Sequence, residues 1–185
     1  MAVKLQAVLV ILLVSAAWAG LPLAAETPAL WIDVPFVAQT KDGCGSAAIS
    51  MLMRYWADKN GQVHSASSDP QKIQAALFSP GGIPAGRMQA YFRQSGYRTF
   101  AFQAEWSDLK HHLQQGRPLI VSLQASGPRG PLHYVVVVGI DSGRNYLFLN
   151  DPAQQKMLRI SRQGFESEWS PMRNWTLLVV PRTAD

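Results

Sequence analysis

The pattern of apolar residues changes near Gly116, and this change constrains the fold more than any other feature of the chain. Before Gly116, apolar residues recur at the spacing of one helix face. After it, alternating or continuous runs rich in Val, Leu and Ile are typical of strands. A parallel sheet would require helices and strands to alternate along the chain, whereas here the helices mostly come first. The sequence therefore predicts an α+β fold in which N-terminal helices pack on a largely antiparallel C-terminal sheet.

The individual elements follow from local signals. The run CGSAAISMLMRYW, which starts at Cys44, places apolar residues at i and i+4 and predicts a buried helix. Asp69 and Pro70 supply the cap and the first residue of a second helix. We expect helices over about 44–56, 70–78, 84–95, 106–116 and 162–169, and strands over about 97–103, 118–124, 133–140, 145–150, 156–160 and 175–180.

The N-terminal segment has the layout of a secretory signal peptide. A basic start that contains Lys4 is followed by an uncharged apolar run over residues 7–17 and by the small-residue patterns AWA and LAA. We therefore predict a signal peptide at residues 1–25 and a single domain at residues 26–185, exported to the periplasm or the extracellular space. An uncleaved N-terminal anchor is the alternative interpretation. In either case we expect membrane contact only through this segment.

Composition argues against several classes of protein. Of 185 residues, 48% are hydrophobic and 16% are charged, which suits one folded core and argues against disorder. The net charge of +5 is scattered, and its densest group (Lys156, Arg159 and Arg162) is not interleaved with aromatic residues, so we expect no nucleic-acid partner. No common metal or nucleotide motif is present, and the adjacent His111 and His112 would point apart on a helix. We therefore expect a monomer without a metal or a cofactor.

Cys44 is the only cysteine of the chain. An exported protein with one cysteine cannot close an internal disulfide, so the side chain is either buried and inert or kept as a reactive thiol. The expected start of a helix favours a thiolate, because free backbone N–H groups and the helix dipole stabilise an anion there. The flanking Gly43 and Gly45 would let a substrate backbone approach the sulfur, although small residues at a helix start also permit tight packing. By position alone, both interpretations stay open.

His133 and Asp151 flank a predicted hairpin. Two apolar strands are joined by the turn sequence DSGR, and a hairpin centred near Ser142 would place each residue nine positions from the centre. Directly opposed residues on antiparallel strands share a face, with Cβ atoms about 4.5–5.5 Å apart. At that separation a carboxylate can hydrogen-bond an imidazole and fix its tautomer. The alternatives are a strand-end histidine facing solvent and an ordinary Asp-Pro turn at Asp151.

Gln39 lies five residues before Cys44, in the same polar loop. Its side-chain amide could donate a hydrogen bond to an oxygen that becomes negative beside the sulfur, together with the backbone N–H of Cys44. A loop glutamine would carry no functional prediction without the cysteine.

The order Gln39, Cys44, His133, Asp151 resembles that of the papain-like cysteine peptidases. More narrowly, the segments VPFVAQTKDGCGSAAISMLMRYW, LHYVVVVGID and YLFLNDPA resemble the bacteriocin-processing, double-glycine peptidase family, and the resemblance spans residues 34–175. It implies a papain-like fold and a peptide or protein substrate. It also implies that Cys44 is the nucleophile, His133 the general base and then acid, Asp151 the orienting residue and Gln39 an oxyanion-hole donor.

The spacing from Gln39 to Cys44 is one residue shorter than in the transporter-linked members, and in this respect the chain resembles the stand-alone exported relatives. The resemblance therefore implies an exported cysteine peptidase but not a double-glycine leader as its substrate. Two alternatives remain from the residues alone. One is another thiol enzyme on the same fold, such as a cell-wall amidase or endopeptidase or an acyltransferase, and the other is a non-catalytic peptide-binding module.

Overall fold

Seven strands of the computed structural model, which describes residues 29–124 and 132–182, form one sheet whose described neighbours are all antiparallel. The strand order is β2-β7-β3-β4-β5-β6, and β1 pairs with the part of β4 that β3 does not reach. The strands are β1 (Leu30–Trp31), β2 (Tyr97–Gln103), β3 (Leu119–Gln124), β4 (Leu132–Asp141), β5 (Tyr146–Asn150), β6 (Leu158–Ser161) and β7 (Trp175–Pro181). The helices are α1 (Cys44–Lys59), α2 (Pro70–Leu77), α3 (Ala85–Gln94), α4 (Trp106–Gln114) and α5 (Arg162–Trp169), with 3-10 turns η1 (Ala66–Ser68) and η2 (Ser170–Met172). The expected antiparallel sheet is confirmed.

The helices and strands expected from the sequence are present, and their ends differ by only a few residues. The clearest difference is at the end of α1. This helix begins at Cys44 as predicted, but it was predicted to stop near Trp56 and continues to Lys59. The ammonium group of Lys59 lies 5.2 Å from the ring centroid of Trp56, and this cation–π contact stabilises the additional turn. Gly61, with φ +65°, ends the segment.

The predicted signal peptide lies outside the described residues. Within residues 29–124 and 132–182, no helix combines the length and the apolar character needed to cross a membrane.

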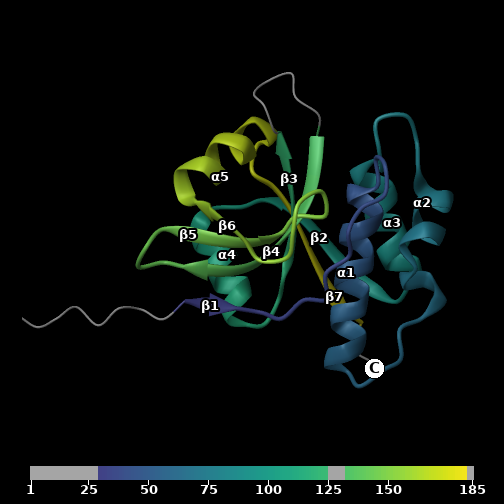
Figure 1. Cartoon of the computed structure of the whole chain (residues 1–185). Helices are drawn as coiled ribbons and strands as arrows, with labels where there is room; N and C mark the ends of the chain where they lie inside the picture. The colour runs from purple at the N-terminus through teal and green to yellow at the C-terminus, as the bar shows by residue number, and fades with distance from the viewer. Residues whose placement is uncertain (1–28, 125–131, 183–185) are drawn as a thin grey trace, which may run out of the picture.

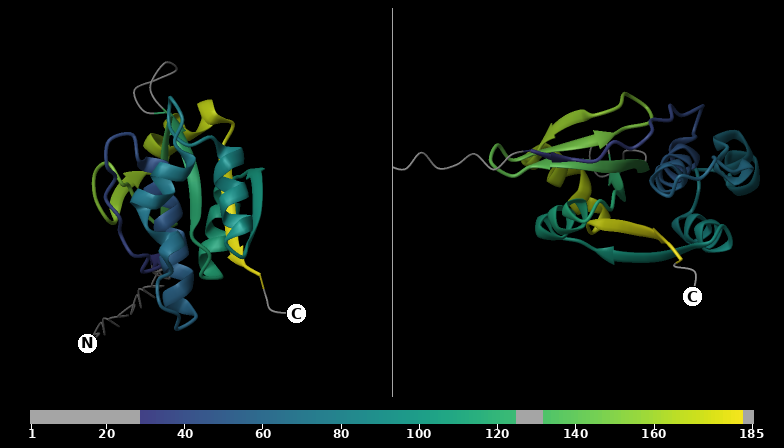
Figure 2. Two further views of the ribbon diagram at one scale, coloured as in Figure 1. Left: turned by 90° about the vertical axis from the view of Figure 1, so that its right-hand side faces the viewer. Right: turned by 90° about the horizontal axis from the view of Figure 1, so that it is seen from below.

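Helices cover both faces of the sheet (Figures 1 and 2). One core lies between the sheet and α1, α2 and α3, and a second lies between the opposite face and α4 and α5. The side chains of β4 alternate between the two cores, so this strand is buried on both faces. Val136 and Val138 face the first core, and Val135 and Val137 face the second. The sequence predicted the N-terminal helices on the sheet but did not assign α4 and α5 to the other face. A continuous apolar strand is typical of a sheet buried on both sides.

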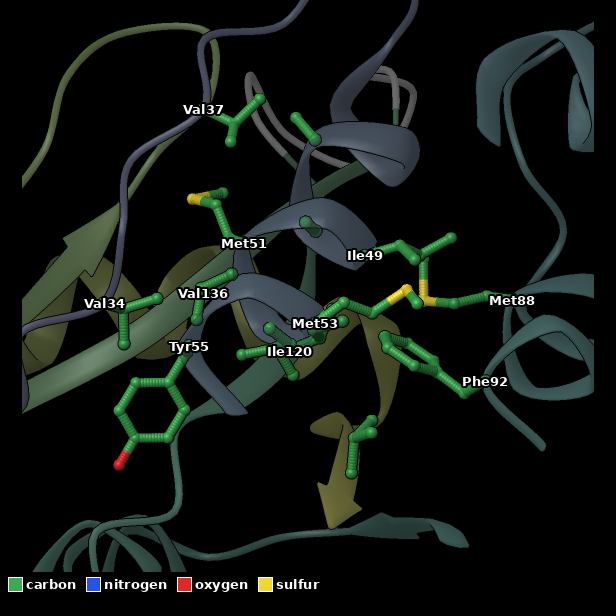
Figure 3. Close-up of a cluster of buried hydrophobic side chains, with 14 of the residues drawn as sticks. Val34, Val37, Ile49, Met51, Met53, Tyr55, Met88, Phe92, Ile120 and Val136 are labelled. Atoms are coloured by element: carbon green, nitrogen blue, oxygen red, sulfur yellow. The ribbon is translucent and has the colours of Figure 1, made fainter. Parts of the chain in front are cut away.

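The helix α1 is the central element of the first core. Most of its length is buried, and Figure 3 shows Ile49 and Met53 beside Met88 and Phe92 of α3. Each large apolar side chain that is fully buried stabilises the fold by about 1.5–3 kcal/mol. The far end of α1 is held to the sheet by the indole of Trp56, which donates to the carbonyl of Val179 at 2.9 Å. These contacts fix the direction of α1 and therefore the place of its first residue, Cys44.

Candidate active site

Cys44 is the first residue of α1 and is half-buried, with a free thiol. The preceding loop closes through a turn in which the N–H of Gly43 donates to the carbonyl of Thr40 at 3.0 Å. No side chain caps the helix, and no acidic residue lies in its first turn. The positive end of the helix is therefore available to stabilise a negative charge on the sulfur.

The structure supports the packing interpretation of the two flanking glycines. A Cβ atom on Gly45 would lie 3.0 Å from the Cβ of Ile83, and one on Gly43 would lie 3.0 Å from the hydroxyl oxygen of Thr40. The room beside both glycines is thus filled by the protein itself. The packing interpretation is the correct one for these two positions.

His133 and Asp151 are joined by a hydrogen bond of 2.7 Å between Nε2 and Oδ1. Both side chains are largely buried, with 18% of the histidine and 5% of the aspartate exposed. Asp151 is held in turn by the backbone N–H of Ala153 at 2.9 Å and by the side-chain amide of Gln154 at 2.6 Å. The carboxylate is therefore fixed in position, and it fixes the ring of His133.

The contact between these residues is as expected, but the predicted register is wrong. The pair Asp141–Tyr146 places the centre of the hairpin between Gly143 and Arg144, and the pair Val136–Asn150 places it at Gly143, whereas the prediction was Ser142. A β-bulge between Val137 and Gly139 accounts for the one-residue difference in register between these two pairs. His133 and Asp151 are therefore not directly opposed. Their offset of two residues along the strand keeps both side chains on one face.

The hydrogen bond to Asp151 occupies Nε2 of His133, which leaves Nδ1 for the sulfur of Cys44. Burial raises the pKa of the Cys44 thiol. Hydrogen bonds from the His133 ring and the Tyr134 backbone, together with the positive charge of His133, lower this pKa by more than burial raises it, so the net shift is downward. Burial lowers the pKa of His133, but hydrogen bonds to Asp151 and Cys44 dominate and raise it to about 9. Burial likewise raises the pKa of Asp151, and its bonds to His133, Ala153 and Gln154 lower it overall. Near neutral pH these directions favour a thiolate beside an imidazolium.

Gln39 is fixed next to the turn that carries Asp151. Its backbone N–H donates to the carbonyl of Pro152 at 2.9 Å. The same segment is held upstream, where the side-chain amide of Asn150 donates to the carbonyl of Val34 at 3.1 Å. Within the described part of the chain, the side-chain oxygen of Gln39 is buried and has no hydrogen-bond partner. The structure thus anchors the backbone of Gln39 at the site, and its role as an oxyanion donor stays a prediction.

Several residues of the site were not predicted. Gln154 supports Asp151, and no sequence signal marked it beyond its place after the Asp-Pro pair. Tyr134 contributes its backbone to the hydrogen bonding of Cys44, and only its position after His133 pointed to it. Cys44 also forms part of the wall of a cavity of about 320 Å³ that includes Tyr134 and Trp175. In residues 29–124 and 132–182, no group of three or more His, Cys, Asp or Glu side chains could hold a metal ion.

Comparison with known proteins gives one family match and several structural ones. The model of the Peptidase_C39 like family matches residues 31–177. No curated protein matches the chain in sequence.

Three solved structures illustrate the structural similarity. The first is a double glycine motif protease from an AMS/PCAT transporter in complex with its leader peptide, with 20% identity and a TM-score of 0.62, covering 82% of this chain and 94% of that one. The second is a Bacillus anthracis protein described as a C39-like peptidase, with 14% identity and a TM-score of 0.66, covering 85% and 100%. The third is the peptidase domain of Streptococcus ComA, a bi-functional ABC transporter, with 22% identity and a TM-score of 0.62, covering 81% and 100%. At these identities the similarity establishes the papain-like α+β fold.

Proposed function

Because the chain belongs to the Peptidase_C39 like family, we propose that it is a cysteine peptidase that hydrolyses peptide bonds through Cys44, His133 and Asp151. One observation carries the proposal: a thiol at the start of a helix is hydrogen-bonded to an imidazole, which is itself bound to a buried carboxylate at 2.7 Å. A nucleophile, a base and a third group that orients the base form the arrangement that nucleophilic catalysis requires.

In the first step, the thiolate of Cys44 attacks the carbonyl carbon of a peptide bond, and the carbonyl oxygen becomes negative. The backbone N–H of Cys44 is free at the helix start and can donate to this oxygen, and we assign a second donation to the amide nitrogen of Gln39. This role requires the amide of Gln39 to turn its nitrogen, not its oxygen, toward the substrate.

In the second step, the imidazolium of His133 gives its proton to the leaving amine, the carbon–nitrogen bond breaks, and a thioester to Cys44 remains. His133, now neutral, takes a proton from a water molecule that attacks the thioester. The carbon–sulfur bond then breaks, the acid product leaves, and the thiolate–imidazolium pair is restored. Asp151 stabilises the imidazolium and fixes its orientation throughout.

The state of the thiol gives a direct test. We expect iodoacetamide to alkylate Cys44 of the folded protein at about pH 6, well below the pKa of about 8.5 of a free thiol. In the His133→Ala variant, alkylation should need a pH closer to that of a free thiol. Alkylation of the wild-type protein that begins only near pH 8.5, or only in denaturant, would contradict an activated thiol.

Hydrolysis itself is tested with a mixture of synthetic peptides, incubated with wild-type protein or with Cys44→Ala and analysed by mass spectrometry. We expect cleavage products with the wild-type protein and none with the variant. Peptide binding that survives in Cys44→Ala without any cleavage by the wild-type protein would instead indicate a binding module. Release of fragments from purified peptidoglycan, but not from linear peptides, would indicate a cell-wall amidase or endopeptidase.

We also propose that the protein is exported, since the first 25 residues have the composition of a signal peptide. Cell fractionation and N-terminal sequencing of the mature protein test this proposal. A full-length chain that still begins at Met1 in the cytoplasmic fraction would contradict it.

A further inference from the structure

The cavity beside Cys44 is built from three segments that are distant in the sequence. Its walls come from the connection between α2 and α3 (residues 79–85), from Ser122 with the start of β4, and from the segment that joins η2 to β7. Its volume of about 320 Å³ is near the lower limit of about 300 Å³ for small-ligand sites. It is also about ten times the volume of about 30 Å³ that one water molecule occupies in the liquid. The space can therefore hold a side chain.

The walls of the cavity are mainly apolar. Ile83, Leu132, Met172 and Trp175 contribute hydrocarbon or aromatic surface, and no Lys, Arg, Asp or Glu among the described residues lines it. Leu132 remains 51% exposed, so apolar surface reaches the mouth of the cavity. A charged side chain placed here would lose water without gaining a partner.

Tyr134 does not change this character. Its ring lies 5.7 Å from that of Trp175, measured between centroids. Burial and the negative charge of Cys44 raise the pKa of Tyr134 to about 12, so the phenol stays neutral.

The position of the cavity relative to the sulfur is fixed by packing. Ile83 is buried and fills the space in which Gly45 would carry a Cβ, so the α2–α3 connection sits directly against the first turn of α1. The hydroxyl of Ser79 donates to the carbonyl of Gly82 at 2.8 Å and closes this connection on itself. The cavity is thus formed before a substrate binds, which reduces the entropy that binding must overcome.

We infer that this cavity binds one aliphatic or aromatic side chain of the substrate next to the scissile bond, so that the enzyme selects an apolar residue there over glycine. The inference rests on the proposed function, because the sulfur in the cavity wall is the proposed nucleophile. A residue without a side chain would leave the apolar walls in contact with water, whereas an apolar side chain would bury them. The similar protease crystallised with its leader peptide is described as a double glycine motif protease. The cavity indicates a different preference for this chain.

The test uses pentapeptides with blocked ends and serine at every position except the central one, which is glycine, leucine, phenylalanine, aspartate or lysine. Two quantities are measured with each peptide: its hydrolysis by the wild-type protein, and the concentration at which it slows the alkylation of Cys44 by iodoacetamide. We expect leucine and phenylalanine to give at least about tenfold higher kcat/KM than glycine, and to protect Cys44 at about tenfold lower concentration.

Two variants link the preference to the cavity. Leu132→Asp places a charge at its exposed mouth, and we expect the advantage of leucine over glycine to fall to about threefold or less. Ala85→Phe, at the half-buried start of α3, should fill part of the space and shift the preference toward small residues. Val63→Asp is the matched control, since Val63 is 93% exposed and does not line the cavity, and it should leave the preference unchanged.

The two readouts separate this inference from the proposed function. Protection by leucine and phenylalanine without any hydrolysis supports the apolar subsite and overturns the peptidase proposal. Hydrolysis with equal or better rates for glycine, and without selective protection, overturns the subsite and leaves the peptidase proposal standing. If the wild-type protein and both cavity variants show the same advantage of leucine over glycine, the subsite is also overturned.

Discussion

An aspartate–histidine pair lies near each end of α1, and the hydrogen bonds of the two pairs have the same length. Nε2 of His64 lies 2.7 Å from Oδ1 of Asp58 near the last turn, and Nε2 of His133 lies 2.7 Å from Oδ1 of Asp151 beside the first turn. Their surroundings differ. The first pair is 41% and 52% exposed, and the second is 18% and 5% exposed.

The length of the hydrogen bond therefore does not distinguish the proposed catalytic pair from the exposed pair. An exposed pair is screened by water and contributes about 0–1 kcal/mol. The buried pair has further partners: Ala153 and Gln154 hold the carboxylate, and Cys44 faces the ring. Burial and a third polar group, not the aspartate–histidine contact, therefore distinguish the two ends of the helix.

Removing each imidazole should give the largest contrast between the two ends. His133→Ala should lower kcat/KM for peptide hydrolysis by roughly 10⁴-fold, because the proton donor and acceptor is lost. His64→Ala should change it by less than about twofold. Steady-state kinetics on a peptide that the wild-type protein cleaves, with circular dichroism as a check of folding, measures both. Similar losses of kcat/KM in the two variants would contradict the proposed active site at His133.

Changing each carboxylate to an amide should have a smaller effect. Asp151→Asn keeps the shape of the side chain but removes the charge that stabilises the imidazolium, and kcat/KM should fall by roughly 10²–10³-fold. Asp58→Asn should leave the rate within about twofold of the wild-type value. The pH needed to alkylate Cys44 should rise in Asp151→Asn alone. An unchanged rate in Asp151→Asn would remove Asp151 from the mechanism.

Glutamine residues near each end of α1 allow a third comparison. Gln39→Ala should lower kcat by roughly 10²-fold if its amide donates to the oxyanion, because one such donor lowers the activation free energy by about 2.7–4 kcal/mol. Gln62 follows the other end of the helix and is exposed, and Gln62→Ala is the matched control. A rise in KM with unchanged kcat would assign Gln39 to substrate binding and not to the oxyanion.

The smallest expected effect is on stability. The folded protein raises the pKa of His133 to about 9, from an ordinary value near 6.5. The protonated ring therefore stabilises the fold fully below pH 6.5, and this contribution is lost as the pH rises through 9.

Cys44→Ala is the suitable background for this measurement. In the wild-type protein the lowered pKa of Cys44 makes the free energy of unfolding rise with pH over the same pH range, which would mask the loss from His133. In Cys44→Ala the contribution of Cys44 to the raised pKa of His133 is absent and that of Asp151 remains, so urea unfolding from pH 6.5 to 9 should show a loss of roughly 2 kcal/mol or less. The double variant Cys44→Ala, Asp151→Asn should lose less, and equal slopes in the two proteins would contradict a ring stabilised by Asp151.

The sequence predicted the elements of the fold and the contact between His133 and Asp151, because these depend on local periodicity, on a turn signal and on the order of short motifs. It missed the register of the hairpin in two ways: the turn occupies residues 142–145 and is therefore centred later than predicted, and a bulge then shifts the pairing by one residue. The bulge lies where β1 packs on β4, and a Cβ on Gly139 would lie 2.8 Å from the carbonyl oxygen of Leu30. That contact joins residues more than a hundred positions apart, so no local pattern reports it.

The cavity was missed for a similar reason. Ile83, Leu132 and Trp175 belong to three segments that meet only in the folded protein. Each residue taken alone fits the pattern of ordinary core or loop residues. The interpretation of Gly45 as an opening failed because its neighbour, Ile83, is likewise supplied by tertiary packing.

The segment that leads from β1 to Gln39 is tied to the sheet at both ends, through the bond from Ile32 N–H to the carbonyl of Val138 at 2.7 Å and the bond from Gln39 to Pro152. The sheet and the segment tied to it thus hold Gln39, His133 and Asp151, whereas α1 holds Cys44. Under the proposed mechanism, the sulfur meets the imidazole only where α1 packs against the sheet, so activity depends on this interface even at positions that contact none of the proposed catalytic groups.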